Sequence, residues 1–224
     1  MICRSLTLAS AITVLVVPAF AQEMKFNRIA SFQVADNLPN AEETSSEIID
    51  ATADGMTLVY TDSPGSSIGF IDIADPRNPK AAGVFMPDGE PTSVSVIGNL
   101  AIAGVNTSES YTQPSGYLVE VDVRTRAEVG RCTLPGQPDS VGIAPDGSFL
   151  AVAIENERDE DLGNGRVGQL PAGSVFMVDL TAEGRVACDT ARVADITGLA
   201  DIAPEDPEPE FVSINADNEV AVSL

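Results

Sequence analysis

The sequence contains no histidine and no tryptophan, and only 12 of its 224 residues are lysine or arginine. Without histidine, the chain itself cannot form a Ser-His-Asp triad, a Cys-His pair or a histidine-ligated zinc site. Any chemistry must therefore use carboxylates, hydroxyls, arginine or a bound ion. With 34 acidic residues the formal net charge is −22, so the chain repels nucleic acid and anionic lipid and attracts cations. Apolar residues make up 44% of the sequence, enough to build a buried core.

The first residues have the pattern of a secretory signal peptide. Arg4 precedes an apolar run over residues 6–17, and Ala19 and Ala21 supply the small residues that precede a cleavage site. A membrane anchor is the alternative, but the run has about 12 residues where a span needs about 20. We expect cleavage after Ala21, which removes Arg4 and leaves a net charge of −23. The mature protein is then periplasmic or secreted, without a membrane span.

Cysteine is scarce, and its distribution favours one disulfide. Cys3 belongs to the predicted signal peptide, so Cys132 and Cys188 remain as an even pair. In an oxidising compartment such a pair is expected to be bonded. Two free thiols are the alternative.

Four segments repeat a pattern of strand, tight turn and strand. The turns carry residues suited to the positive φ angles of short hairpins. The first three segments are each followed by an apolar run that ends on an aspartate, and then by a polar turn and a fourth short strand. The segments are 47–62, 92–106, 139–156 and 210–224; the turns are Asp54-Gly55, Gly98-Asn99, Asp146-Gly147 and Asp217-Asn218; the aspartates are Asp72, Asp122 and Asp179; the fourth strands are 81–86, 128–134 and 185–190.

The spacing of these units predicts an all-β fold, a β-propeller of four-stranded antiparallel blades. The units start at Ile49, Val94, Val141 and Val212, which gives spacings of 45, 47 and 71 residues. Units of about 40–50 residues with four short strands are typical of propeller blades. A solenoid of β-hairpins is the alternative, and the absence of a Trp-Asp dipeptide argues against the WD40 type.

The predicted propeller is incomplete in this chain. Residues 46–206 supply about three blades and 207–224 the first hairpin of a fourth, whereas propellers close with about 4–8 blades. We expect the remaining blades from a missing C-terminal part of a longer protein, with a partner chain as the alternative. The predicted domains are a signal peptide (1–21), a lead-in segment or strand (22–45) and a partial propeller (46–224).

Charge is predicted to be divided between the two faces of the propeller. Because the first two strands of a blade are antiparallel, the lead-in to the first strand and the loop between the second and third share one face. That face is expected to be anionic and to attract cations, although ordinary solubilising charge is the alternative. Its carboxylates are Glu47, Glu90, Asp139, Glu208, Glu210, Asp62, Glu109, Glu155, Glu157, Asp159, Glu160 and Asp161. The cations of the opposite face or outer strands are Arg77, Lys80, Arg124, Arg126, Arg131, Arg185 and Arg192, with Arg158 and Arg166 as exceptions.

The loop AIENERDEDLGNGR (153–166) is the most acidic stretch of this face. Glu155 and Glu157 alternate at the end of a strand and should share one side of it. Residues 159–161 lack the spacing of an EF-hand calcium loop and are expected to face solvent. Segment 204–210, in which proline alternates with acid, is expected to be an extended linker. The predicted calcium ligands are Glu47, Glu90, Asp139, Glu155, Glu157 and Glu210.

Several distinctive phrases resemble one family of secreted bacterial propellers. They are ETSSEIIDATADG (43–55), DSPGSSIGFIDIADP (62–76), EPTSV (90–94), NTSESY (106–111), QPDSV (137–141), AIENERDED (153–161) and APEDPEPEF (203–211). From about residue 28 onward the chain is similar to the propellers labelled "esterase-like activity of phytase", which overlap the YncE-like and choice-of-anchor groups. The resemblance implies an exported bacterial propeller of seven-bladed type and hydrolysis of phosphate esters or other esters, by similarity to calcium-dependent propeller phytases.

Two functions follow as hypotheses. In the first, Ca²⁺ held by the six predicted ligands polarises a phosphoryl oxygen and activates water, which makes the protein a metal-dependent phosphoric-ester hydrolase. In the second, the propeller is not catalytic and binds a small molecule or a protein on the acidic face. The sequence leaves open whether the protein is an enzyme, and it identifies no catalytic residue.

Overall fold

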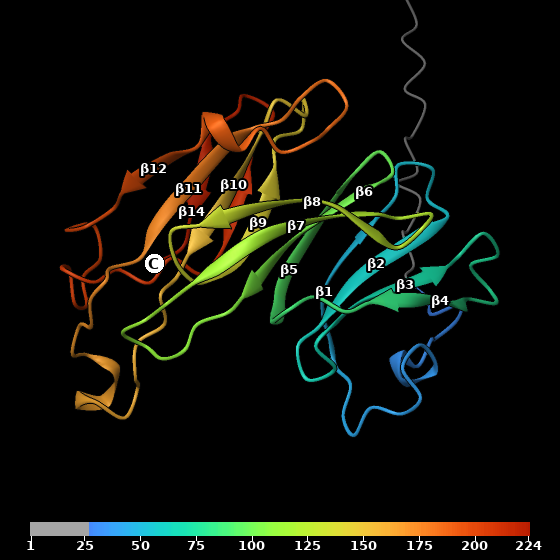
Figure 1. The fold of residues 1–224 in the computed structure, drawn as a ribbon, viewed down its shortest axis with the longest axis horizontal. Coiled ribbons are helices and arrows are strands. Elements are labelled where there is room, and N and C mark those ends of the chain that lie inside the picture. The colour runs from blue at the N-terminus through green and yellow to red at the C-terminus, as the bar shows by residue number, and fades with distance from the viewer. Residues whose placement is uncertain (1–26) are drawn as a thin grey trace, which may run out of the picture.

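The computed structural model describes residues 27–224, so the predicted signal peptide lies outside the described residues. The described chain forms three four-stranded sheets and one two-stranded sheet, with antiparallel neighbours in chain order (Figure 1). Blade 1 holds β1 (Ser46–Ala51), β2 (Thr57–Asp62), β3 (Ser67–Asp72) and β4 (Lys80–Phe85). Blade 2 holds β5 (Glu90–Ile97), β6 (Leu100–Asn106), β7 (Gly116–Asp122) and β8 (Ala127–Leu134). Blade 3 holds β9 (Pro138–Ile143), β10 (Phe149–Ile154), β11 (Ser174–Asp179) and β12 (Arg192–Asp195), and the last hairpin holds β13 (Val212–Ile214) and β14 (Val220–Val222).

Helix is confined, in the described residues, to three short 3₁₀ turns. These are η1 (Val34–Asp36), η2 (Gly163–Gly165) and η3 (Cys188–Thr190). No helix of this part of the chain is long and apolar enough to cross a membrane. The predicted all-β fold with propeller-type blades is confirmed.

The hairpin turns adopt the backbone that the sequence predicts. Gly55, Gly98, Gly147 and Asn218 have φ angles of 68°, 59°, 72° and 63°. These left-handed conformations are favourable for glycine and tolerated by asparagine. Each turn joins the first two strands of a unit.

The prediction that residues 185–190 form the fourth strand of blade 3 is wrong. The strand that pairs with β11 is β12, which begins at Arg192. Before it, the chain closes back on the end of β11, because the hydroxyl of Thr190 accepts the N–H of Asp179 at 2.9 Å and the N–H of Ala187 donates to the carbonyl of Asp179 at 3.0 Å. These local bonds hold residues 188–190 in the turn η3, so the strand begins only at Arg192.

The core lies between neighbouring blades because the middle strands are buried on both faces. On β6, Ala101, Ala103 and Val105 belong to the cluster shared with blade 1, whereas Leu100 and Ile102 belong to the cluster shared with blade 3. Alternate side chains of a strand point to opposite faces, so a continuous apolar run serves two interfaces. A third cluster joins blade 3 to the last hairpin. Sheets stacked in this way are blades rather than a ladder of hairpins.

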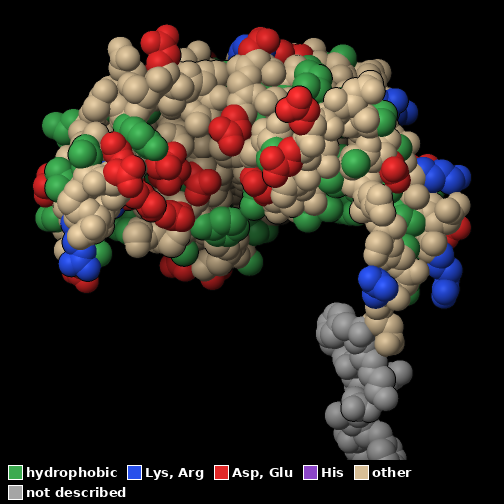
Figure 2. Space-filling model, turned by 90° about the horizontal axis from the view of Figure 1, so that it is seen from below, with side chains coloured by type: hydrophobic (Ala, Val, Ile, Leu, Met, Phe, Trp, Pro, Cys, Tyr) green, Lys and Arg blue, Asp and Glu red, His purple; other side chains and the backbone are tan. Residues whose placement is uncertain are grey.

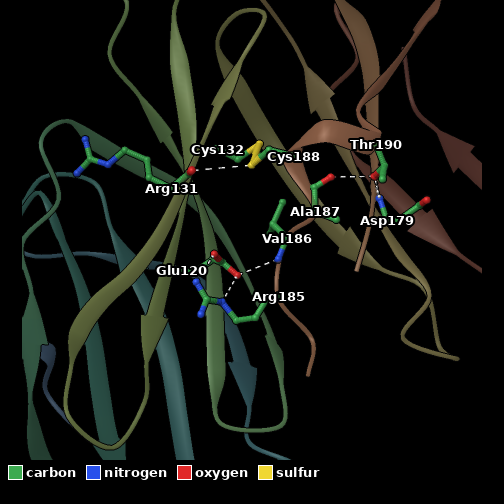
Figure 3. Close-up of a disulfide and its surroundings, with 9 residues drawn as sticks. All are labelled: Glu120, Arg131, Cys132, Asp179, Arg185, Val186, Ala187, Cys188 and Thr190. Atoms are coloured by element: carbon green, nitrogen blue, oxygen red, sulfur yellow. Dashed lines mark hydrogen bonds and ion pairs between the residues drawn. A yellow bond between two sulfur atoms is a disulfide. The ribbon is translucent and has the colours of Figure 1, made fainter. Parts of the chain in front are cut away.

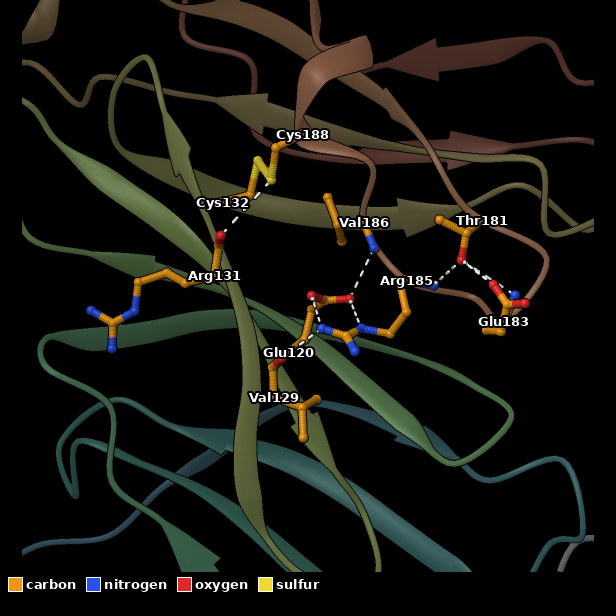
Figure 4. A network of polar contacts seen from close by, with 9 residues as sticks. All are labelled: Glu120, Val129, Arg131, Cys132, Thr181, Glu183, Arg185, Val186 and Cys188. Atoms are coloured by element: carbon orange, nitrogen blue, oxygen red, sulfur yellow. Dashed lines mark hydrogen bonds and ion pairs between the residues drawn. A yellow bond between two sulfur atoms is a disulfide. The ribbon is translucent and has the colours of Figure 1, made fainter.

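A covalent and an ionic link join the outer parts of blades 2 and 3. A disulfide connects Cys132 of β8 to Cys188 of η3, whose Cα atoms are 5.8 Å apart (Figure 3). Close to it, the carboxylate of Glu120, which is 4% exposed, accepts bonds from Arg185 Nε at 2.8 Å and from the amide of Val186 at 2.9 Å (Figure 4). The buried charge is therefore paired and hydrogen-bonded, as a stable buried carboxylate requires.

The described part of the lead-in segment, residues 27–45, forms turns and η1 but no strand. Asn37 attaches it to blade 1. Its side-chain amide donates to the hydroxyl of Tyr60 at 3.0 Å and to the carbonyl of Phe70 at 2.8 Å, and its oxygen accepts the N–H of Gly83 at 3.0 Å. One side chain thus bonds to three strands of the blade.

Candidate acidic site

Each complete blade has one extra residue near the start of its innermost strand. The register shifts by one residue between β1 and β2, between β5 and β6, and between β9 and β10. Such a bulge bends the strand and redirects its side chains. Glu47 and Asp139 lie within the bulges of blades 1 and 3, at the ends of these strands that face the long loops. The same local distortion therefore presents a carboxylate on one face in two blades.

Serine hydroxyls next to these bulges link consecutive inner strands. The hydroxyl of Ser93 accepts the N–H of Val141 at 3.0 Å, and that of Ser140 accepts the N–H of Val212 at 3.2 Å. Both serines are at most 3% exposed. The bonds fix how far each blade lies from the next. Sequence reasoning missed them, although both serines directly precede the apolar residue that opens a unit.

Six carboxylates on this face form what we call the acidic cluster. Burial raises the pKa of Asp139 to about 6, followed by repulsion from Glu210, Glu157 and Glu47. The pKa of Glu155 is raised to about 8; burial is the largest cause, and repulsion from four neighbouring carboxylates adds to it. The cluster comprises Glu47, Asp139, Glu155, Glu157, Glu208 and Glu210. The burial and the surrounding negative charge therefore disfavour the ionised form of Glu155.

Cations are almost absent from the acidic cluster. Within residues 27–224, Glu208 is the one member in an ion pair, and its partner is Arg158. Figure 2 shows Asp and Glu side chains gathered on one side of the face, while the visible Lys and Arg side chains lie mostly towards its ends. The charge of Glu208 is therefore paired, whereas Asp139 and Glu155 have no cation partner among the described residues and have raised pKa values.

Glu90 does not join the other predicted ligands. It is exposed at the start of β5, where it pairs with Asn106, and it is not among the charges that act on Asp139 or Glu155. Glu208 takes part instead. The difference follows from the position in the repeat: Glu47, Asp139 and Glu210 each stand two residues before the apolar residue that opens a unit, whereas Glu90 stands four before.

The donor set has the chemistry that calcium prefers, but its geometry is not that of a formed site. Carboxylate oxygens are the usual ligands of Ca²⁺. Among the described residues, no three acidic side chains are arranged to hold a metal ion. The carboxylates interact through their charges without converging on one point, so binding an ion requires side-chain rotation.

Asn156 explains why Glu155 and Glu157 lie together at the end of β10. It has a φ of 51° and is 2% exposed. Its side-chain oxygen accepts the N–H of Gln137 at 2.9 Å, and its amide donates to the carbonyl of Ala172 at 3.0 Å. The turn at Asn156 keeps both glutamates near the preceding strand, where Gln137 also donates to Glu157 at 3.4 Å.

Residues 159–161 lie at the edge of the face. The N–H of Asp161 donates to the carboxylate of Asp159 at 3.0 Å, and Glu160 and Asp161 are exposed. Together with Glu157, these carboxylates raise the pKa of Tyr111, which belongs to the corresponding loop of blade 2. The loops of neighbouring blades therefore approach each other over this part of the surface.

Arg158, an exception in the charge pattern, holds the long loop onto segment 204–210. Its side chain is 10% exposed, forms an ion pair with Glu208, and donates to the carbonyl of Asp206 at 2.7 Å. Its Nε donates to the carbonyl of Gly165 at 3.0 Å. Asp206 is fully buried, so this segment is packed rather than a loose linker. Sequence reasoning missed the contact because it joins residues about 50 positions apart.

A pocket of about 750 Å³ adjoins the acidic cluster and shares Glu208 and Glu210 with it. Its other polar walls include Glu160, Asn164 and Arg166. Arg166 is exposed and forms no ion pair within the described part of the chain. The cluster therefore opens onto a space large enough for a small ligand.

Comparison with known proteins identifies the family. Residues 47–224 match the model of the choice-of-anchor I domain. The chain belongs to this family. The matched range of the choice-of-anchor I domain begins within β1 and contains every blade described above. No curated protein matches the sequence.

Solved structures share the fold of this choice-of-anchor I domain at low identity. Hydrazine synthase of Kuenenia stuttgartiensis is 18% identical with a TM-score of 0.55, over 80% of this chain and 43% of that chain. A chain of the mitotic checkpoint complex is 12% identical with a TM-score of 0.51, over 80% of this chain and 46% of that chain. At such identities the likeness shows the fold alone. The chain spans less than half the length of either protein.

Proposed function

We propose that this choice-of-anchor I domain is a binding module of an exported protein and that its acidic cluster is a cation site, with Ca²⁺ as the first candidate. The observation that supports the proposal is the crowding of Asp139, Glu155 and Glu157: burial, and then repulsion between neighbouring carboxylates, raises the pKa values of Asp139 and Glu155. A bound cation removes that repulsion and draws the carboxylates together. The family's description supports a protein attached at or released from the cell surface.

Export is proposed to proceed with cleavage after Ala21. The small residues Ala19 and Ala21 and the preceding apolar run support it. Amino-terminal sequencing of the protein recovered from the periplasm or medium tests it. A mature chain that begins at Gln22 is expected, and a protein that retains Arg4 contradicts the proposal.

Calcium binding is tested by thermal unfolding of the mature chain at pH 7.5 with EDTA, with Mg²⁺ and with Ca²⁺. Saturation at about 100 times the Kd stabilises the folded state by about 2.7 kcal/mol, which raises Tm by roughly 5–10 °C. The shift is expected to disappear in Asp139→Asn and to persist in Glu90→Gln, which alters a carboxylate outside the acidic cluster. Equal Tm values with EDTA and Ca²⁺, or equal shifts in the two variants, contradict the proposal.

A second candidate function is hydrolysis of phosphate esters. Glu155 favours it, because a carboxyl group with a pKa of about 8 is protonated at neutral pH and has the state that a general acid needs. Arg166, in the adjoining pocket, offers a cation for a phosphoryl oxygen. Turnover of p-nitrophenyl phosphate that needs Ca²⁺ and is lost in Glu155→Gln supports this function. If the protein binds calcium but shows no turnover, hydrolysis is contradicted and the binding function is retained.

A further inference from the structure

A second pocket lies on the face opposite the acidic cluster. It has a volume of about 550 Å³ and is formed by the turns at the other ends of the strands of blades 1 and 2. Phe70, Ala82 and Val123 contribute its apolar lining. Its polar lining consists of Thr52, Asp54, Thr57, Asn99, Arg124 and Arg126. Two of the few cations of the chain therefore meet in one pocket.

Arg126 stands in a backbone conformation that favours glycine. Its φ is 59°, in the left-handed region that side-chain-bearing residues rarely adopt. In the corresponding turn of blade 3 the left-handed residue is Gly184, with a φ of 77°. Glycine would fit this position without strain, so the backbone conformation does not itself select arginine.

The side chain of Arg126 crosses from blade 2 to blade 1. A Cβ atom on Gly83 of β4 would lie 3.4 Å from the Cδ and Nε atoms of Arg126, so the arginine stem rests against the backbone of blade 1. Arg126 is exposed, and its side chain reaches the edge of blade 1 at the junction between the two blades. This places it in the wall of the pocket.

Neither arginine forms an ion pair within residues 27–224, although the charge of Arg124 acts on the nearby carboxylate of Asp122. Asp54 also lines the pocket, but its carboxylate already accepts the hydroxyl of Thr52 at 2.7 Å and the N–H of Met56 at 3.0 Å. The lining thus carries two cations and one engaged carboxylate, and the carboxylate of Asp122 lies close to Arg124. The chain as a whole has a net charge of −22.

We propose that this pocket binds a small molecule through a carboxylate or phosphate group held by Arg124 and Arg126. Guanidinium groups bind these oxyanions in bidentate geometry, and two of them enclose one anion from two sides. The side-chain amide of Asn99 forms no hydrogen bond within the described residues and is a further donor in the same pocket. The strongly negative chain repels polyanions, so the ligand is a small anion rather than a nucleic acid.

The test is calorimetric titration of the mature chain with inorganic phosphate and, separately, with succinate, at low ionic strength. Arg126→Gly and Arg124→Ala are each expected to lower the affinity about tenfold or more. Arg77→Ala is the matched control, because it removes an exposed arginine from another turn of the same face outside the pocket. It is expected to bind as the wild type does. The probe that binds more tightly identifies the oxyanion.

Arg126→Gly also separates binding from folding. Glycine adopts the left-handed conformation without strain, so the variant is expected to keep the wild-type Tm in the absence of anion. Binding unchanged in Arg126→Gly, an equal loss in Arg77→Ala, or no heat from either probe with the wild type overturns the proposal. The site is independent of the acidic cluster, and Glu155→Gln is expected to leave anion binding unchanged.

Discussion

Replacing Glu155 by glutamine should stabilise the protein at alkaline pH and leave it unchanged at acidic pH. Folding raises the pKa of this carboxyl group from 4.5 to about 8, first through burial and then through neighbouring carboxylates. The folded state therefore binds a proton that the unfolded state releases. This contribution to stability is fully present below pH 4.5 and is lost as the pH rises towards 8. Glutamine is neutral throughout and has the same shape.

The magnitude follows from the size of the pKa change. A rise from 4.5 to about 8 corresponds to at most about 5 kcal/mol. Because Glu155 is only partly buried, solvent screening reduces this to about 2–3 kcal/mol, or roughly 5–10 °C in Tm for a chain of this size.

The assay is urea unfolding of wild type, Glu155→Gln and Glu90→Gln between pH 4.5 and 9 in EDTA. The free energy of unfolding of the wild type is expected to fall across this range, while that of Glu155→Gln falls less. Glu90→Gln, outside the acidic cluster, should follow the wild type. Parallel pH profiles of wild type and Glu155→Gln would refute the reasoning, because they would mean that Glu155 titrates normally in the folded protein.

Three further predictions concern the links within the fold. Ser140→Ala removes the acceptor for a buried amide of the next hairpin and should cost about 1–3 kcal/mol in urea unfolding, whereas Ser213→Ala, at an exposed site, should cost less than about 0.5 kcal/mol. Cys188→Ser opens a loop that spans 56 positions and should lower the stability by about 4 kcal/mol, an effect that dithiothreitol reproduces in the wild type but not in the variant. Arg158→Ala leaves the buried carboxylate of Asp206 without its cation and should cost about 3–5 kcal/mol, with faster proteolysis of the long loop; Arg158→Ala combined with Asp206→Asn should be milder than the single change. Unfolding curves and cleavage rates equal to those of the wild type would contradict each in turn.

The blades could be predicted because their determinants are local. Alternation within strands and glycine or asparagine in the turns specify each hairpin, and the structure has left-handed residues at those turns. The prediction of the fourth strand of blade 3 failed because the hydroxyl of Thr190 accepts the N–H of Asp179, the last residue of β11. A single side-chain bond of this kind leaves no periodic pattern in the sequence, so it could not be predicted.

The candidate site was predictable only in part. Glu47, Asp139 and Glu210 come together because each stands two residues before the apolar residue that opens a unit, a position that is readable from the repeat. Glu208 and Arg158 were not identified as a pair, because their contact joins two long segments whose paths depend on the rest of the fold. Residues in register with a repeat can be placed from sequence, and residues on long loops require the tertiary structure.

The hydroxyl bonds between inner strands make blade spacing independent of loop length. The third unit is 71 residues long, against 45 and 47 for the others, yet Ser140 reaches the next hairpin at 3.2 Å just as Ser93 reaches blade 3 at 3.0 Å. The extra residues of the third unit therefore lie on the face of the acidic cluster, and the hydroxyl bond to the next hairpin is kept. A foreign loop inserted between β10 and β11, beyond the contacts of Asn156 and Arg158, should accordingly leave the blades where they are.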